Sequence, residues 1–286
     1  MLTSNKIGFS TNIYDNPADM VNLVDFITDD YKIVEIEFEK DFRVHLDENP
    51  SSWNEIKEKL KSIKSDKDIS FSCHAPYLGV ETDIANSDEI TRLVAVDYLS
   101  KYIVMSSEVG AKYLTIHPGY VEVNSSGVDG FSFEQLDKSI GSLSKIAKEN
   151  DILLLLENTG NEREKYIVLS DEQHDSLCKY DNVFLTLDIV HYHSFYYECS
   201  PEEYYSKLKS LLPSIKNAHF NDVLNGKHIH LPLNKGNFNF NDVLSYMVEE
   251  GYKGNFIIEE SGGGYEPVDF FESGKQYMNL LNNRSN

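Results

Sequence analysis

The sequence predicts an α/β fold, a single (β/α)8 TIM barrel over residues 1–286. Short apolar runs alternate with amphipathic stretches along the whole chain, as in repeated strand and helix units. No Pro/Gly-rich linker or shift in composition divides these units. A chain of 286 residues with 41% hydrophobic residues is long enough to bury one large core.

Near-continuous apolar runs are typical of strands that are buried on both faces of a parallel sheet. We predict such strands at 7–10, 33–38, 69–74, 113–117, 152–157, 183–188, 215–220 and 256–260. Amphipathic periodicity predicts helices at 17–28, 51–64, 87–109, 133–149, 201–212, 239–250 and 267–282. The alternative is an open doubly wound sheet, but no G-x-G-x-x-G motif follows the first strand.

The charge of the chain restricts its partners. With 47 acidic and 26 basic residues the formal net charge is −21, whereas proteins that bind DNA usually present a basic face. The densest basic stretch, 57–67, is interleaved with acids and is typical of a solvated helix face. We therefore expect a small-molecule substrate. Nucleic acid is disfavoured, although a local basic groove stays open.

The sequence also predicts a cytoplasmic protein without a membrane partner. No segment approaches the roughly 20 apolar residues of a membrane span, and the first ten residues, MLTSNKIGFS, lack the features of a signal peptide. Three scattered cysteines are too few for a disulfide framework. Tyrosines cluster after the sixth strand, where packing over the barrel mouth or a homo-oligomer contact would use them.

Metal-capable side chains follow nearly every strand from the third onward. The carboxyl ends of barrel strands meet at one face, so these side chains should surround one pocket. They are His74, His117, Glu157, Asp188, His191, His219, Asp222 and Glu259, with His228 and His230 in the loop after the seventh strand. With His193, which also follows the sixth strand, all of the nine histidines except His45 and His174 occupy such positions.

Each of these residues has a structural interpretation of its own, as a hydrogen-bonded histidine or as a helix N-cap. Independent structural histidines have no reason to gather at the same end of successive strands, however, so the whole set indicates a metal site. Imidazole and carboxylate ligands suit zinc, manganese, iron or cobalt better than calcium.

The motifs CHAPY, IHPG, LENTG, LDIVH, HFND, HIHLPLNKG and IIEE, in this order and spacing, resemble the xylose-isomerase-like barrel superfamily. The resemblance covers about residues 5 to 262, nearly the whole chain. That group contains sugar and sugar-phosphate isomerases and epimerases, and also the endonuclease IV type of abasic-site nuclease. The combination of motifs is specific for the superfamily and much less so for either branch.

The resemblance implies roles for individual residues. In the isomerase and epimerase branch one divalent ion is held at positions matching Glu157, Asp188, His219 and Glu259. The two glutamates also move protons there, and the match of His191 contacts substrate. In the endonuclease IV branch a trinuclear zinc cluster adds the positions of His74, His117, His191, His228 and His230, and Tyr77 has a counterpart.

His228 departs from the nuclease pattern, in which this position is an aspartate. The loss of an anionic ligand removes negative charge that would balance the positive charge of a cluster of dications. We therefore expect about one to three divalent ions per chain, of zinc, manganese, iron or cobalt. Tyr77, His191 and Lys235 are candidate substrate-binding residues, since Lys235 lies beside the H-x-H stretch and could meet a phosphate.

Two mechanisms suit such a site. In the first, an isomerase or epimerase uses Glu157 and Glu259 to exchange a proton on a sugar carbon through an enediolate-like intermediate. In the second, two or three metal ions activate water for hydrolysis of a phosphodiester, as in cleavage of abasic DNA. The extra histidines favour the second, whereas the negative charge and His228 favour the first, which we prefer. A non-catalytic barrel used for binding is a third alternative, disfavoured because buried carboxylates without a cation are costly.

Overall fold

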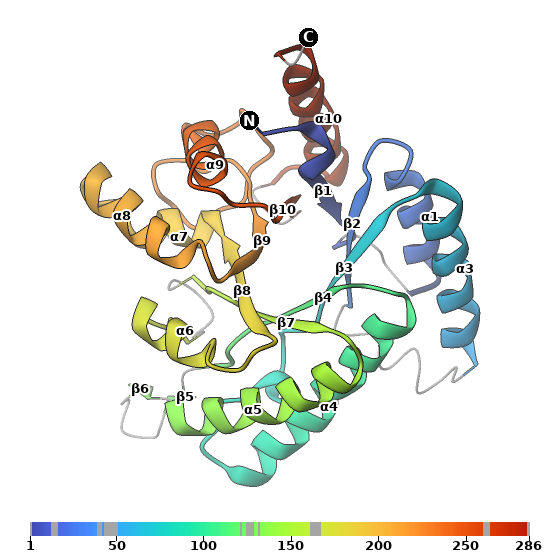
Figure 1. The fold of residues 1–286 in the computed structure, drawn as a ribbon, viewed down its shortest axis with the longest axis vertical. Coiled ribbons are helices and arrows are strands. Elements are labelled where there is room, and N and C mark those ends of the chain that lie inside the picture. The colour runs from blue at the N-terminus through green and yellow to red at the C-terminus, as the bar shows by residue number, and fades with distance from the viewer. Residues whose placement is uncertain are drawn as a thin grey trace.

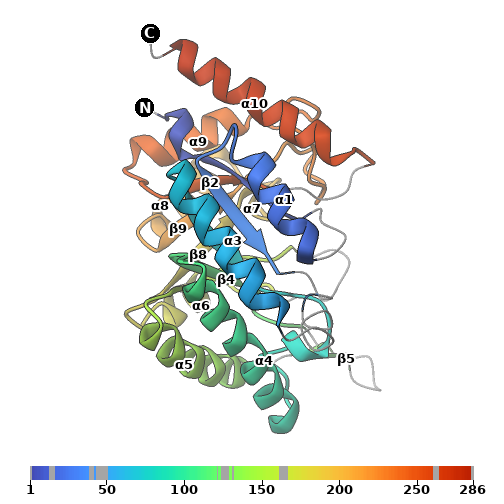
Figure 2. The same cartoon turned by 90° about the vertical axis from the view of Figure 1, so that its right-hand side faces the viewer.

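The computed structural model describes residues 2–12, 17–38, 42, 51–120, 122–123, 129–130, 132–160, 167–259 and 264–284. Eight parallel strands close into a barrel in the order β1-β10-β9-β8-β7-β4-β3-β2. Figure 1 shows these strands at the centre and the helices around them, and Figure 2 shows the same arrangement from the side. The predicted (β/α)8 barrel is confirmed.

The barrel strands differ from the predicted runs only at their ends. They are β1 (Ile7–Ser10), β2 (Ile33–Glu37), β3 (Ser70–His74), β4 (Tyr113–Ile116), β7 (Leu153–Glu157), β8 (Val183–Asp188), β9 (Ile215–His219) and β10 (Asn255–Ile258). A short antiparallel pair, β5 (Glu122–Val123) and β6 (Asp129–Gly130), lies outside the barrel and was not predicted.

Every predicted helix has a counterpart. The counterparts are α1 (Pro17–Ile27), α3 (Ser52–Lys67), α4 (Glu89–Glu108), α5 (Phe133–Glu149), α8 (Pro201–Leu211), α9 (Phe240–Glu249) and α10 (Pro267–Arg284). Two short helices, α6 (Asp171–Leu177) and α7 (Ile189–Phe195), were not predicted, because seven residues are too few to display a clear helical period. Two 3-10 turns, η1 (Ser4–Lys6) and η2 (Val80–Thr82), complete the described elements.

The side chains of each strand lie in two environments, because successive side chains point to opposite faces of the sheet. One set of strand residues packs against the helices in the main hydrophobic core, as Ile36, Leu114 and Leu156 do. The other set points into the barrel and is largely polar below the carboxyl end. There the hydroxyl groups of Thr115 and Thr186 lie 2.8 Å apart across the interior. The barrel thus carries a polar layer directly beneath the predicted site.

No helix within the described ranges has both the length and the apolar composition needed to cross a membrane. The three cysteines are free thiols, and Cys73 is fully buried. Burial raises the pKa of the Cys73 thiol to about 12, so this residue is an apolar core side chain in practice.

Candidate metal centre

The residues predicted at the strand ends lie together at the carboxyl end of the barrel in three groups. Within each group, every residue offers one ligand atom, and these atoms lie within 4.8 Å of one another. The groups are His74, His117 and Glu157; Glu157, Asp188, His219 and Glu259; and His191, His228 and His230. We call them the first, second and third ligand groups.

Glu157 ends β7 and joins the first two groups. Its Oε2 lies 3.0 Å from Nε2 of His74 and 3.3 Å from Nε2 of His117. Its Oε1 lies 3.3 Å from Nδ1 of His219. The ring of His74 is oriented by its other nitrogen, which lies 2.8 Å from the carbonyl oxygen of Ala75. One carboxylate therefore has an oxygen available to each of two groups.

Asp188 caps a helix with one carboxylate oxygen and has the other oxygen left for a ligand. It is the N-cap of α7, since its Oδ1 accepts a 2.7 Å hydrogen bond from the backbone N–H of His191. Its Oδ2 is buried and has no hydrogen-bond partner among the described residues. The cap also places His191 in the first turn of α7, where Nδ1 of its ring lies 2.8 Å from the carbonyl oxygen of Asn158. This leaves Nε2 of His191 for a ligand.

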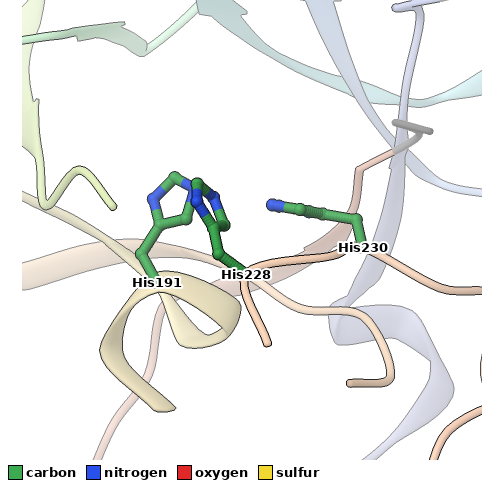
Figure 3. Close-up of side chains that lie close together, drawn as sticks. All are labelled: His191, His228 and His230. Atoms are coloured by element: carbon green, nitrogen blue, oxygen red, sulfur yellow. The ribbon is translucent and has the colours of Figure 1, made fainter. Parts of the chain in front are cut away.

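The third ligand group consists of histidines alone. Figure 3 shows the rings of His191, His228 and His230 turned toward one another. The ring centroids of His191 and His228 are 4.4 Å apart, and those of His191 and His230 are 5.4 Å apart. Gly160 of the LENTG motif permits this approach, because a Cβ at position 160 would overlap the ring of His228. Three histidines form a recognised zinc ligand set.

The sequence interpretation missed Glu35, which lies within β2. This carboxylate is fully buried, and its Oε1 lies 2.6 Å from Nε2 of His219. Burial would raise the pKa of Glu35, but the contact with His219 holds it below its ordinary value. The signal was present in the run V-E-I-E-F, where two glutamates alternate inside an otherwise apolar strand. The second of them, Glu37, is also buried and accepts a 2.6 Å hydrogen bond from Ser10.

The two glutamates of the second group have opposed pKa shifts. Burial would raise the pKa of Glu157, but His219 and His117 hold it well below its ordinary value. Burial raises the pKa of Glu259 well above its ordinary value, and the charges of Glu157 and Asp188 oppose the attraction of His219. A cation bound in the second group would favour the ionised form of both carboxyl groups.

The histidines also differ in charge. Burial lowers the pKa of His191 to about 3 and that of His230 to about 4, so both are neutral at physiological pH. Neutral imidazole is the form that binds metal ions. Burial would lower the pKa of His74, but the hydrogen bond and charge of Glu157 raise it to about 9.

The donor set fits a divalent cation. Nδ1 of His219 and Nδ1 of His230, like Oδ2 of Asp188, are buried without a hydrogen-bond partner among the described residues. Buried polar atoms are otherwise nearly always paired in proteins. Nδ1 of His219 lies between two carboxylates, 3.3 Å from Glu157 and 3.5 Å from Glu259. A cation in the second group would satisfy Oδ2 of Asp188 and Nδ1 of His219 and reduce the repulsion between the carboxylates.

The remaining candidate residues differ in how they relate to the three ligand groups. The ring of Tyr77 stacks on that of His117 with centroids 4.6 Å apart, so it covers one side of the first group. Lys235 is exposed in the turn after the H-x-H stretch, and its role in substrate binding stays a prediction. Asp222 belongs to none of the three groups. Its carboxylate accepts hydrogen bonds from the backbone of Val223, Gly236 and Phe238, which shape the loop that carries the H-x-H stretch.

The chain is similar in sequence to an uncharacterized protein and to a probable endonuclease. It is 27% identical over 231 residues to an uncharacterized protein of Methanocaldococcus jannaschii, covering 79% of this chain and 75% of that one. It is 26% identical over 219 residues to a probable endonuclease 4 of Mycoplasmopsis agalactiae, covering 73% of this chain and 74% of the relative.

Solved structures of sugar epimerases have the same fold. A D-tagatose 3-epimerase-like protein matches with a TM-score of 0.75 and 22% identity, covering 98% of this chain and 100% of that chain. D-psicose 3-epimerase of Clostridium cellulolyticum H10 matches with a TM-score of 0.72 and 14% identity, covering 97% and 98%. The family described as xylose isomerase-like TIM barrel matches residues 28–279. The chain belongs to this family.

Proposed function

We propose that this protein is a divalent-metal-dependent isomerase or epimerase that acts on a small sugar, polyol or sugar phosphate. The observation that carries the proposal is the second ligand group, in which two glutamates, an aspartate and a histidine are buried around one point. Sugar epimerases are among the solved structures with this fold, and a sugar is the substrate class that we propose. The net charge of −21 favours a small substrate over a long polyanion.

A divalent ion bound by this group would stabilise negative charge that develops on a substrate oxygen. Glu157 and Glu259 reach the group from strands that are separated in the barrel by β8 and β9. In the proposed reaction one glutamate removes a proton from the carbon next to the carbonyl, and the other returns a proton. Tyr77 stacks on His117 of the first group, and Nδ1 of His191 lies 3.9 Å from Oε1 of Glu157, so both would orient the substrate.

A second candidate function is hydrolysis of a phosphodiester by a multinuclear centre, as the similarity to a probable endonuclease suggests. The first and third ligand groups favour it, because proton transfer at one ion needs neither of them. Replacement of an anionic ligand by His228 opposes it, since a third dication would then be held by imidazoles alone.

Two measurements separate these functions. The first is the number of zinc, manganese, iron or cobalt ions per chain, determined by mass spectrometry after purification without chelator. The second is incorporation of solvent deuterium next to the carbonyl in a panel of ketoses and ketose phosphates that includes D-tagatose and D-fructose, followed by proton NMR. Exchange that disappears in Glu259→Gln supports the isomerase or epimerase.

The alternative outcome is equally definite. Two or three ions per chain, with cleavage of an abasic duplex that disappears in Glu259→Gln, would establish the phosphodiesterase instead. A protein that binds no ion at any added concentration would overturn both functions and favour the non-catalytic barrel.

A further inference from the structure

Glu35 connects the metal centre to the polar interior of the barrel. Its side chain is fully buried, and it contacts residues from two other strands. Oε1 lies 2.6 Å from Nε2 of His219 on β9. Oε2 accepts hydrogen bonds of 2.9 Å from the hydroxyl of Ser72 on β3 and 2.8 Å from the amide of Asn217 on β9. These three contacts hold the carboxylate in one orientation.

This arrangement decides which nitrogen of His219 carries a proton. An ionised carboxylate only accepts hydrogen bonds, so Nε2 of His219 must donate to Glu35. In neutral imidazole the other nitrogen, Nδ1, then keeps its lone pair. Nδ1 is the atom that lies 3.3 Å from Oε1 of Glu157 and 3.5 Å from Oε2 of Glu259. With an ion in the second ligand group, His219 would be the neutral imidazole, and the lone pair of Nδ1 would point to that ion.

We propose that Glu35 is a positioning residue of the metal centre, which holds His219 in the tautomer that binds an ion and adds a negative charge behind this ligand. Such outer carboxylates fix the ring of a ligand histidine and make its free nitrogen more basic. The inference rests on the proposed function to the extent that it requires an ion in the second ligand group.

The test is the affinity of Glu35→Gln for zinc and cobalt, measured by competition with a chelating indicator. Glutamine has the same shape and can accept the hydrogen bond from His219. Asn217 can turn its amide to suit the new side chain, because its Oδ1 has no hydrogen-bond partner among the described residues. We expect the affinity of the second group to fall about 10- to 100-fold while the protein remains folded.

Glu37→Gln is the matched control. Glu37 is the next inward-facing residue of β2 and is also buried, but its carboxylate accepts a hydrogen bond from Ser10, and its charge acts on His74 of the first ligand group. Its substitution should therefore change the metal affinity less than that of Glu35. Equal losses in the two variants would mean that a buried negative charge anywhere on β2 suffices, which would overturn the positioning role.

A second measurement does not depend on how the variants fold. Nitrogen-15 NMR of the wild-type histidines in the zinc-loaded protein should report His219 with Nε2 protonated and Nδ1 without a proton. A proton on Nδ1 in that state would overturn the inference. If the wild-type protein binds metal and Glu35→Gln binds it with the same affinity, the inference is refuted and the proposed function stands. If the wild-type protein binds neither zinc nor cobalt, both the inference and the proposed function are refuted.

Discussion

The substitution Glu157→Gln tests the site most directly, because this carboxylate belongs to two ligand groups. Its Oε2 lies 3.0 Å and 3.3 Å from ligand nitrogens of the first group, and its Oε1 lies 3.3 Å from a ligand nitrogen of the second. If each group holds one ion, the variant should lose affinity at two positions at once. His228→Ala is the matched control, since His228 belongs to the third group alone and its loss should affect at most one ion.

Turnover by Glu157→Gln should fall by at least about 10²- to 10⁴-fold, the usual contribution of a group that transfers a proton. The fold should persist, because glutamine keeps the volume of the side chain and can still hydrogen bond to His74. The assays are metal analysis, deuterium exchange into the substrate and the circular dichroism spectrum. Near-normal turnover with full metal content would refute the assignment of Glu157, and loss of the native spectrum would refute the claim that its charge serves the site rather than the fold.

Three further predictions follow from single features of the structure. Burial lowers the pKa of His174 to about 4 from 6.5, so the unfolded chain takes up a proton that the folded chain does not. The free energy of unfolding should therefore fall by about 3 kcal/mol as the pH drops from 6.5 to about 4. Urea unfolding at pH 7 and pH 4.5 should show a smaller difference in His174→Asn, and an equal difference would contradict the assignment. Gly160→Ala should displace His228 and reduce metal binding at the third group, while the ion of the second group remains in metal analysis. An abasic duplex should not be cleaved with zinc or manganese supplied, and its binding should be weak even at low salt; cleavage that is lost in Glu259→Gln would reverse our preference.

The sequence by itself determined the barrel and the positions of most candidate ligands. Alternation of apolar strands with amphipathic helices is a local property, and it predicted every barrel strand to within its ends. The ligand positions follow from the same pattern. A polar residue at the end of an apolar run must lie at the carboxyl face of a parallel barrel, whichever strands are its neighbours. The sequence alone therefore placed Glu157, Asp188 and His219 at this face.

Only the tertiary structure decided how these residues combine. Glu35 contacts His219 across 184 positions of sequence, and this pairing depends on the stagger of the strands around the barrel, which no local period encodes. The same holds for the division into three groups with Glu157 shared by two of them. Asp222 resembles a ligand in sequence, but loop amide groups occupy its carboxylate. A strand-end position determines which face a side chain joins, whereas its partner depends on packing across the barrel interior.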